Sequence, residues 1–412
     1  MQLSKKAGNI SPSITLEITA KANELKSQGI DVVSFGAGEP DFNTPENIIE
    51  AAIKAMKDGK TKYTPAGGIL QLKETICNKF KNDNNLEYKP SQIIVSTGAK
   101  QSLANTFMAI LNPGDEVLIP VPYWVSYPEL VKLADGVPVF VNTDEKDNYK
   151  YTIESLNSAL TSKTKAILLN SPNNPTGTIY NKEELVEIAE FAKENDLIII
   201  SDEIYEKLIY DGNEHISIAS LSQDAYERTI VINGVSKTYA MTGWRLGYAA
   251  ASEQIVKHMT SIQSHMTSNV NTIAQYASIE ALNGPIEDLK NMVKEFESRR
   301  NFMIEKLNSI DGISIIKPNG AFYIMVNISE YLNTSLNGIK ISNSLDFAKV
   351  LLEEEKVAVI PGSGFGLDNY VRLSYATSKE IIGKGIERIS SFLNKLKSVS
   401  YTHLRAHETR SN

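Results

Sequence analysis

Three chemically complementary side chains follow short apolar segments in the middle of the chain. Asp202 follows LIIIS, Lys237 lies four positions past the segment IVIN, and Arg245 lies eight positions past the lysine. A lysine amine can condense with a carbonyl, a carboxylate can keep a ring nitrogen protonated, and a guanidinium can fork onto a phosphate. Pyridoxal phosphate requires this combination of groups, so the spacing predicts a site for that cofactor.

Other catalytic chemistries lack their characteristic residues. Ahead of residue 399 the histidines are His215, His258 and His265, and none stands in an H-E-x-x-H spacing. The string GSGFG at 362–366 is not the dinucleotide fingerprint, and no G-x-x-x-x-G-K-[ST] loop occurs. We therefore expect no metal site, and the sequence disfavours a Ser-His-Asp, nicotinamide or nucleoside-triphosphate mechanism.

Asp202, Lys237 and Arg245 can form one site only if a sheet brings the strands that precede or follow them side by side. Between residues 91 and 250 short apolar runs alternate with helical patterns, as in a mostly parallel sheet covered by helices on both faces. Seven such runs predict strands, at 92–96, 116–120, 137–141, 165–170, 197–201, 229–233 and 246–250. In α/β folds ligands gather at the carboxyl ends of the strands, and here those ends carry the polar and Gly/Pro-rich sequence. We expect one composite site there.

The rest of the chain predicts a second, smaller α/β unit formed by both chain ends. We expect residues 1–46 to be an N-terminal segment that packs with this small domain. Residues 47–300 form the large cofactor-binding domain with its mostly parallel seven-stranded sheet, and residues 301–398 form the small domain. Residues 399–412 have no apolar period, and the string from Val399 to Thr409 resembles the translation of a sequencing adapter. We expect that tail to be non-native.

Composition narrows the class of protein. The chain has 412 residues with 42 Lys+Arg against 49 Asp+Glu, a formal net charge of −7. That balance argues against a general nucleic-acid or anionic-membrane binder, and no aliphatic stretch is long enough to span a bilayer. The single cysteine, Cys77, and the absence of an apolar leader favour the reducing cytoplasm.

Several strings around these side chains match one known family. They are AGEPDF (37–42), KYTPAGG (62–68), NSPNNPTG (170–177), SDEIYE (201–206), SKTYAMTGWRLGYA (236–249) and VRLSYA (371–376). Over residues 5 to 397 the chain resembles the fold type I pyridoxal-phosphate aminotransferases, and PYWVSYPE (122–129) narrows the resemblance to prokaryotic aspartate aminotransferases. The resemblance implies transfer of the amino group of L-aspartate to 2-oxoglutarate, giving oxaloacetate and L-glutamate, with pyridoxal 5'-phosphate.

The resemblance also implies roles for individual residues. Lys237 matches the lysine that forms the Schiff base and shuttles the proton, and we expect its cationic neighbours to lower its pKa. Asp202 matches the partner of the pyridine nitrogen. Tyr205 and Asn174 match the groups that bond the cofactor O3′, and the family implies a cis Asn174–Pro175 bond.

A phosphate cup is expected where a strand gives way to a helix. Gly98, Ala99 and Lys100 lie in STGAKQSL, where free backbone N–H groups and the helix dipole attract an anion. By the resemblance, Ser236 and Arg245 complete this cup.

Two aromatic residues complete the expected cofactor site. Tyr63 matches the tyrosine that reaches the phosphate of a neighbouring subunit, so a full site implies a homodimer with shared active sites. Trp124 matches the aromatic side chain that stacks on the cofactor ring, and with Asn174 it also borders the substrate.

Substrate recognition is expected at both ends of a dicarboxylate. Arg372 matches the arginine that grips the α-carboxylate bidentately, beside the backbone of Gly38. Lys100 is the candidate for the distal carboxylate, although family members acting on aromatic acids or prephenate share much of this scaffold. A β-lyase or decarboxylase would use the same Lys, Asp and Arg set. A non-catalytic cofactor-binding regulator is a further alternative, but no basic DNA-binding segment precedes the site.

Overall fold

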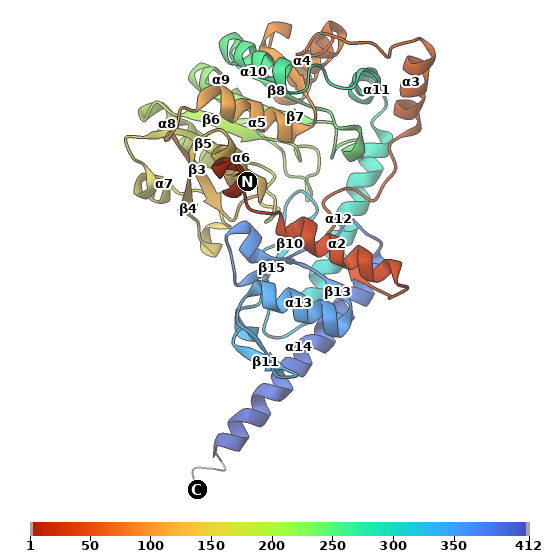
Figure 1. The fold of residues 1–412 in the computed structure, drawn as a ribbon, viewed down its shortest axis with the longest axis vertical. Coiled ribbons are helices and arrows are strands. Elements are labelled where there is room, and N and C mark those ends of the chain that lie inside the picture. Colours follow the sequence, from red (N-terminus) through yellow and green to blue (C-terminus); the bar gives the residue numbers. More distant parts are fainter. Residues whose placement is uncertain (1–2, 409–412) are drawn as a thin grey trace.

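The chain is built on two sheets of different size. The computed structural model describes the backbone of residues 3–408 and the side chains of residues 3–397. A seven-stranded sheet flanked by helices forms one part, and a four-stranded sheet with its own helices forms the other (Figure 1). The predicted α/β class with one large and one smaller unit is therefore confirmed.

All seven predicted strands form the large sheet, in the order β2-β8-β7-β6-β5-β3-β4. β8 runs antiparallel to both of its neighbours and every other pair is parallel. The strands are β2 (Ile93–Ser96), β3 (Glu116–Val121), β4 (Val137–Asn142), β5 (Thr164–Asn170), β6 (Ile198–Asp202), β7 (Thr229–Gly234) and β8 (Gly247–Ala250).

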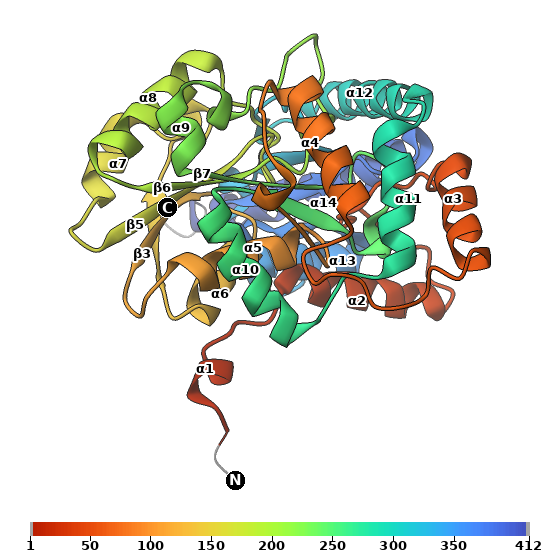
Figure 2. The ribbon, with the colours of Figure 1, turned by 90° about the horizontal axis from the view of Figure 1, so that it is seen from above.

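Helices cover both faces of this sheet because its central strands are apolar on both sides. Along β5, Ala166 and Leu168 belong to one buried cluster, whereas Ile167 and Leu169 belong to another on the opposite face. Helices therefore lie above and below the strands (Figure 2). One face carries α5 (Ala99–Ile110), α6 (Ser126–Leu133) and α10 (Glu253–Met266). The other carries α3 (Glu46–Lys57), α4 (Leu70–Asn84), α7 (Ile153–Ala159), α8 (Lys182–Glu194), α9 (Gln223–Arg228) and α11 (Thr272–Asn283).

Local sequence sets where these helices begin. At α8 the Asn181 side chain accepts a hydrogen bond from the Glu184 N–H at 2.9 Å, and the Glu184 carboxylate accepts one from the Asn181 N–H at 2.7 Å. This reciprocal capping satisfies two backbone donors that a helix start leaves free. The helix consequently starts at Lys182, a short distance past the Gly- and Pro-rich segment NSPNNPTG (170–177).

The smaller sheet is antiparallel in the order β14-β15-β10-β9. Its register places Tyr323 opposite Ser374 and Met325 opposite Arg372, so Tyr323 and Arg372 share one face of the sheet as diagonal neighbours. The elements of this part are α12 (Glu287–Asn308), β9 (Ser314–Ile315), β10 (Tyr323–Asn327), β11 (Thr334–Leu336), β12 (Ile339–Ile341), α13 (Ser344–Glu355), β13 (Val357–Ala358), β14 (Ile360–Pro361), β15 (Tyr370–Ser374) and α14 (Lys379–Glu408).

From α2 onward the N-terminal segment lies against the C-terminal part of the chain (Figure 1), whereas Lys6 bonds Asp135 and the Ser11 N–H bonds Glu129 in the large part. β1 (Val33–Ser34) pairs in parallel with β13, and α2 (Ile14–Ser27) buries Ile18 and Ala22 in the cluster that contains Met325. A short helix, α1 (Lys5–Gly8), precedes it. On these contacts we propose the division into residues 1–46, 47–300 and 301–398 given above.

The last helix extends beyond the expected end of the native chain. α14 runs to Glu408, but its buried side chains among the described residues end at Leu396. Part of the tail expected to be non-native, residues 409–412, lies outside the described residues. Within the described part of the chain, no helix combines the length and apolarity needed to cross a membrane.

Candidate active site

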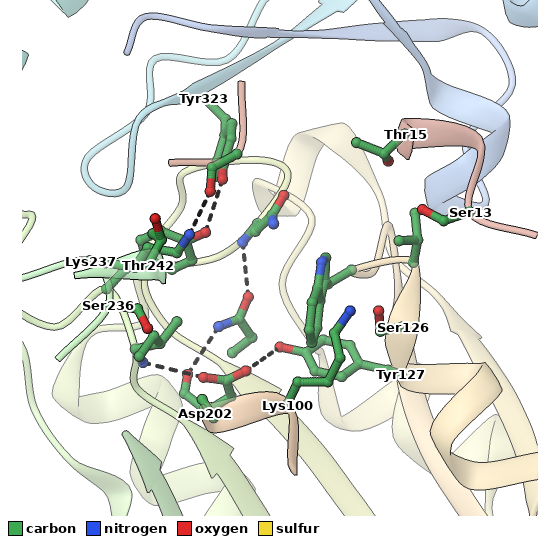
Figure 3. Close-up of a pocket in the computed structure, with 18 of the residues that line it drawn as sticks. Ser13, Thr15, Lys100, Ser126, Tyr127, Asp202, Ser236, Lys237, Thr242 and Tyr323 are labelled. Atoms are coloured by element: carbon green, nitrogen blue, oxygen red, sulfur yellow. Dashed lines mark hydrogen bonds between the residues drawn. The ribbon is translucent and has the colours of Figure 1, made fainter. Parts of the chain in front are cut away.

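A cavity of about 300 Å³ opens at the carboxyl ends of the strands of the large sheet and reaches the smaller sheet. Asp202 ends β6 and Lys237 follows β7, and both line the cavity (Figure 3). Arg372 in β15 lines it as well. Most of the predicted site residues line this single cavity: Gly38, Ala99, Lys100, Trp124, Asn174, Asp202, Tyr205, Ser236, Lys237, Arg245 and Arg372. Parallel strands thus bring together residues more than a hundred positions apart.

The expected phosphate cup lies at the start of α5. Gly98 precedes the helix with φ of +81°, and a Cβ at this position would lie 2.6 Å from Nη2 of Arg245. Only glycine therefore lets the guanidinium lie directly over the backbone there. The first N–H groups of a helix lack intrahelical acceptors, so this place offers donors and a cation to an anion.

Tyr63 lies outside the cavity of a single chain. Its side chain is 92% exposed, in the segment between α3 and α4. The structure of one chain neither brings it to the other site residues nor gives its hydroxyl a partner among the described residues.

Asp202 is a buried carboxylate to which no cation of the described residues is bonded. Its Oδ2 accepts a hydrogen bond from the Tyr127 hydroxyl at 2.8 Å, and its Oδ1 accepts one from the Ile204 N–H at 3.2 Å. Burial raises the pKa of Asp202 to about 6, and these two hydrogen bonds oppose that rise only in part. A cationic N–H bound beside Asp202 would stabilise its charged form.

Lys237 is a partly buried amine whose Nζ donates a hydrogen bond to the Gly38 carbonyl. Burial is the largest cause that lowers its pKa, to about 8. Its Nζ lies 6.0 Å from the centre of the Tyr205 ring and 5.8 Å from that of the Phe322 ring, to one side of this ring pair. We expected neighbouring cations to be the cause. Arg245 and Arg372 do contribute, but Glu39 opposes them, so desolvation rather than charge dominates.

This low pKa predicts that Lys237 reacts with aldehydes near neutral pH. In cofactor-free protein, reductive labelling of Lys237 by a small aldehyde should rise with pH around a midpoint of about 8, because only the neutral amine adds to a carbonyl, and should then level off. An ordinary lysine titrates near 10.4. Peptide mass spectrometry across a pH series measures the midpoint, and labelling that is still rising steeply at pH 10 would contradict the assignment.

Arg372 presents two unused donors to the cavity. The side chain is buried and its Nη1 donates to Oδ1 of Asn174 at 2.9 Å. Its Nε and Nη2 are also buried, and neither bonds an acceptor among the described residues. Buried guanidinium donors without acceptors are costly, and a carboxylate bound in a fork would satisfy both.

Lys100 and Trp124 lie together at the cavity. The Lys100 ammonium lies 4.9 Å from the centre of the Trp124 ring, and within the described chain no carboxylate pairs with it. Partial loss of water around the amine, and then the charge of Arg245, lower the pKa of Lys100. This cation is therefore available to a second acidic group of a ligand.

Among the cavity residues that sequence reasoning missed, three contact residues of the predicted site. Asn170 donates to the Asp202 carbonyl at 3.0 Å and accepts from the Asn174 N–H at 2.8 Å, which fixes the loop before the Asn174–Pro175 bond. That bond is cis, as predicted. Tyr127 holds Asp202, and Tyr323 contacts both Tyr205 and Arg372. Asn170 and Tyr127 belong to the strings NSPNNPTG and PYWVSYPE that match the family, so the sequence could have pointed to them. Tyr323 belongs to the apolar run GAFYIMV, which is typical of a buried strand.

The sequence of this chain matches one protein family and several known proteins. Residues 30–389 match the family described as aminotransferase class I and II. The aspartate aminotransferase of Bacillus subtilis (strain 168) is 55% identical over 395 residues, which cover 96% of this chain and 100% of the relative. The "probable aspartate/prephenate aminotransferase" of Aquifex aeolicus (strain VF5) is 47% identical, over 96% and 99% of the two chains.

Solved structures agree with the sequence relatives. The aspartate aminotransferase of Rhizobium meliloti superposes with a TM-score of 0.92 at 41% identity, covering 96% of this chain and 100% of that one. The Thermus thermophilus aspartate aminotransferase with maleate gives a TM-score of 0.90 at 43% identity, covering 95% and 99%. Both likenesses extend over nearly the whole of each chain.

Proposed function

This chain belongs to the aminotransferase class I and II family, and from that premise we propose that it transfers the amino group of L-aspartate to 2-oxoglutarate, giving oxaloacetate and L-glutamate. The observation that carries the proposal is the pair of unused donors on Arg372, in the same cavity as Lys237 and Asp202. An amino acid held by its carboxylate at Arg372 would lie in reach of the Lys237 amine.

We propose that the cofactor is pyridoxal 5'-phosphate, since the residues present fit it. Asp202 is a buried carboxylate suited to a protonated ring nitrogen, and the Gly98 cradle under Arg245, with Ala99, Lys100 and Ser236 nearby, suits its phosphate. Trp124 and Tyr205 would contact its ring and its O3′. When bound, this cofactor supplies a carbonyl that takes the amino group and a ring that accepts electrons from the substrate Cα.

Side chains of the cavity would transfer the proton and position the substrate. Lys237, whose pKa of about 8 leaves part of the amine neutral at physiological pH, would take the proton from the substrate Cα. Arg372 and Asn174 would fix the α-carboxylate, so that the Cα–H bond faces the amine. Holding the reacting atoms in this geometry removes much of the entropic barrier.

A dicarboxylate would suit the cavity because cations from different elements line it. Arg372 belongs to β15 of the small sheet, and Lys100, beside Trp124, belongs to α5. The Thermus thermophilus relative, 43% identical, was solved with maleate, itself a dicarboxylate. Two separated cations in an otherwise acidic chain support an acidic substrate over a neutral one.

A panel of amino donors tests the proposed function. Each of aspartate, glutamate, alanine, phenylalanine and tyrosine is offered with 2-oxoglutarate, and oxaloacetate and prephenate are offered as acceptors with glutamate as donor. We expect aspartate with 2-oxoglutarate to give the highest kcat/KM. Faster reaction with prephenate or with aromatic donors would overturn the aspartate assignment, and no transfer from any donor would overturn the aminotransferase itself.

Lys100→Ala should weaken selection of acidic substrates. Loss of one charged contact with the distal carboxylate is expected to lower the ratio of kcat/KM for aspartate to that for alanine by about tenfold to a hundredfold. Alanine has no distal carboxylate, so each variant contains its own control. Lys100→Arg keeps the charge and should retain most of the preference. An unchanged ratio of the aspartate and alanine kcat/KM values in Lys100→Ala would show that another group binds the distal carboxylate.

We propose that the enzyme is a homodimer in which Tyr63 completes the partner's phosphate cup. Support comes from its 92% exposure and its place outside the cavity of its own chain. Mixing Tyr63→Ala and Lys237→Ala subunits tests this. A hybrid dimer has one site with an intact Lys237 and an intact Tyr63 from the other subunit, so cofactor affinity at that site should return to the wild-type value. Absence of this rescue would place Tyr63 elsewhere.

We propose a cytoplasmic location and, besides the second copy of the chain, small-molecule partners, namely amino acids and 2-oxo acids. The single cysteine, Cys77, is partly buried, and the acidic charge balance argues against a general nucleic-acid binder. Retention with a cytoplasmic marker on cell fractionation would support this location.

A further inference from the structure

Tyr323 joins the expected cofactor and substrate ends of the cavity. It begins β10, is 1% exposed, and lines the cavity (Figure 3). Its hydroxyl lies 2.9 Å from the Tyr205 hydroxyl, and its ring centre lies 4.3 Å from the guanidinium carbon of Arg372. One side chain therefore contacts both the phenol proposed for the cofactor O3′ and the arginine proposed for the α-carboxylate.

The hydrogen bond between the two tyrosines has a defined direction once a ligand oxygen is present. Burial raises the pKa of both phenols, so each keeps its one hydrogen. When Tyr205 donates its hydrogen to a ligand, only Tyr323 can donate in the bond between them. Among the described residues the Tyr323 hydroxyl has no other hydrogen-bond partner. Its hydrogen is therefore free to point at Tyr205.

The Tyr323 ring restrains Arg372 at the same time. The guanidinium carbon lies 4.3 Å from the Tyr323 ring centre and 5.0 Å from that of Phe365, both within cation–π range. The antiparallel register places Tyr323 and Arg372 on one face of the sheet. With Nη1 held by Asn174, these rings leave Nε and Nη2 as the free edge of the arginine.

We propose that Tyr323 is a positioning residue with two separable parts. Its hydroxyl orients the hydrogen of Tyr205 toward the cofactor, and its ring holds the plane of Arg372 for the substrate carboxylate. The inference rests on the proposed function, because it assigns those partners to Tyr205 and Arg372.

Tyr323→Phe tests the hydroxyl in the holoenzyme, since it keeps the ring. A hydrogen bond donated by the Tyr323 hydroxyl to the Tyr205 hydroxyl makes Tyr205 a stronger hydrogen-bond donor to the cofactor. Removing the Tyr323 hydroxyl should therefore raise the pH midpoint of the cofactor absorbance by about half a pH unit. Tyr205→Phe should shift this midpoint in the same direction by a larger amount. We expect kcat to fall about three- to tenfold with little change in KM. Tyr375→Phe is the matched control, because Tyr375 is buried in the same cluster and bonds the Ala321 carbonyl, which Tyr210 also bonds.

Tyr323→Leu tests the ring, with Tyr323→Phe as its reference. Loss of the cation–π contact should raise the Kd of maleate, measured by titrating the cofactor absorbance, about five- to thirtyfold above that of Tyr323→Phe. An absorbance midpoint that moves in Tyr205→Phe but not in Tyr323→Phe would overturn the hydroxyl role. Equal maleate Kd values in the Leu and Phe variants would overturn the ring role.

The two proposals fail in different ways. A wild-type holoenzyme that transfers no amino group would overturn the proposed function, while the absorbance midpoint and the maleate Kd would still report whether Tyr323 acts on Tyr205 and Arg372. Normal transfer by wild type with unchanged values in both Tyr323 variants would overturn this inference alone.

Discussion

Lys237→Ala should lose turnover by at least about 10⁴-fold together with the visible absorbance of the bound cofactor. Alanine can neither bond the cofactor carbonyl nor accept the substrate proton. The other lysine that lines the cavity, Lys100, lies over the Trp124 ring instead of beside Tyr205 and Phe322, where Lys237 lies. Steady-state assays with aspartate and 2-oxoglutarate, beside absorbance spectra of the purified protein, measure both losses. The fold should be retained, because the variant removes a desolvated amine rather than a core contact.

Lys207→Ala is the matched control for this variant. Lys207 lies two positions past Tyr205, is partly buried, and pairs with Asp83 at 3.0 Å, and neither residue lines the cavity. We expect its turnover and spectrum to stay close to those of wild type. Turnover by Lys237→Ala within tenfold of the wild-type value would refute the role of Lys237.

Arg372→Lys is expected to lower kcat/KM for aspartate about a hundredfold or more, even though it keeps the positive charge. A lysine cannot offer Nε and Nη2 in a planar fork, so one charged hydrogen bond to the α-carboxylate is lost, at about 1.5–3 kcal/mol, and the other is misplaced. The bond from Nη1 to Asn174 is lost as well. Every amino donor should suffer, since all share the α-carboxylate.

Arg300→Lys separates this effect from the general cost of altering a buried arginine. Arg300 is also fully buried, forks onto Asp211 at 2.7 and 2.8 Å, and lies 4.9 Å from the Tyr210 ring centre. We expect it to lower the Tm while leaving KM for aspartate within about twofold of wild type, since it lies outside the cavity. Similar kinetic losses in both variants would mean that Arg372 acts through stability.

The sequence was sufficient for the large sheet and for most of the cavity. Strands such as β5 and β6 are apolar on both faces, so they appear as continuous runs, and the change to polar residues at Asn170 and Asp202 marks their carboxyl ends. Because parallel strands end at one edge, residues named from separate strings had to converge. The resemblance then supplied Arg372, which lies in the other sheet.

What the sequence could not supply depends on three-dimensional surroundings. Nothing in GAFYIMV distinguishes Tyr323 from Phe322, and only the register between β10 and β15 places Tyr323 beside Arg372. The pKa of Lys237 is set mainly by desolvation, and a sequence motif does not show how far a side chain is removed from water. A single chain likewise leaves Tyr63 exposed, so its role depends on a second subunit.

The contact between Asn174 and Arg372 joins the two sheets at the cavity itself. Nearby, the Gly177 carbonyl accepts hydrogen bonds from the N–H groups of Asn319 and Gly320, both at 2.9 Å. Elements of a protein open locally with different free energies. Detachment of the small sheet would therefore leave Asp202 and Lys237 in place but carry Arg372 away. Such a partly opened molecule would still hold its cofactor but would no longer bind amino acids. Loss of substrate binding and loss of cofactor would therefore occur at two separate stages of unfolding.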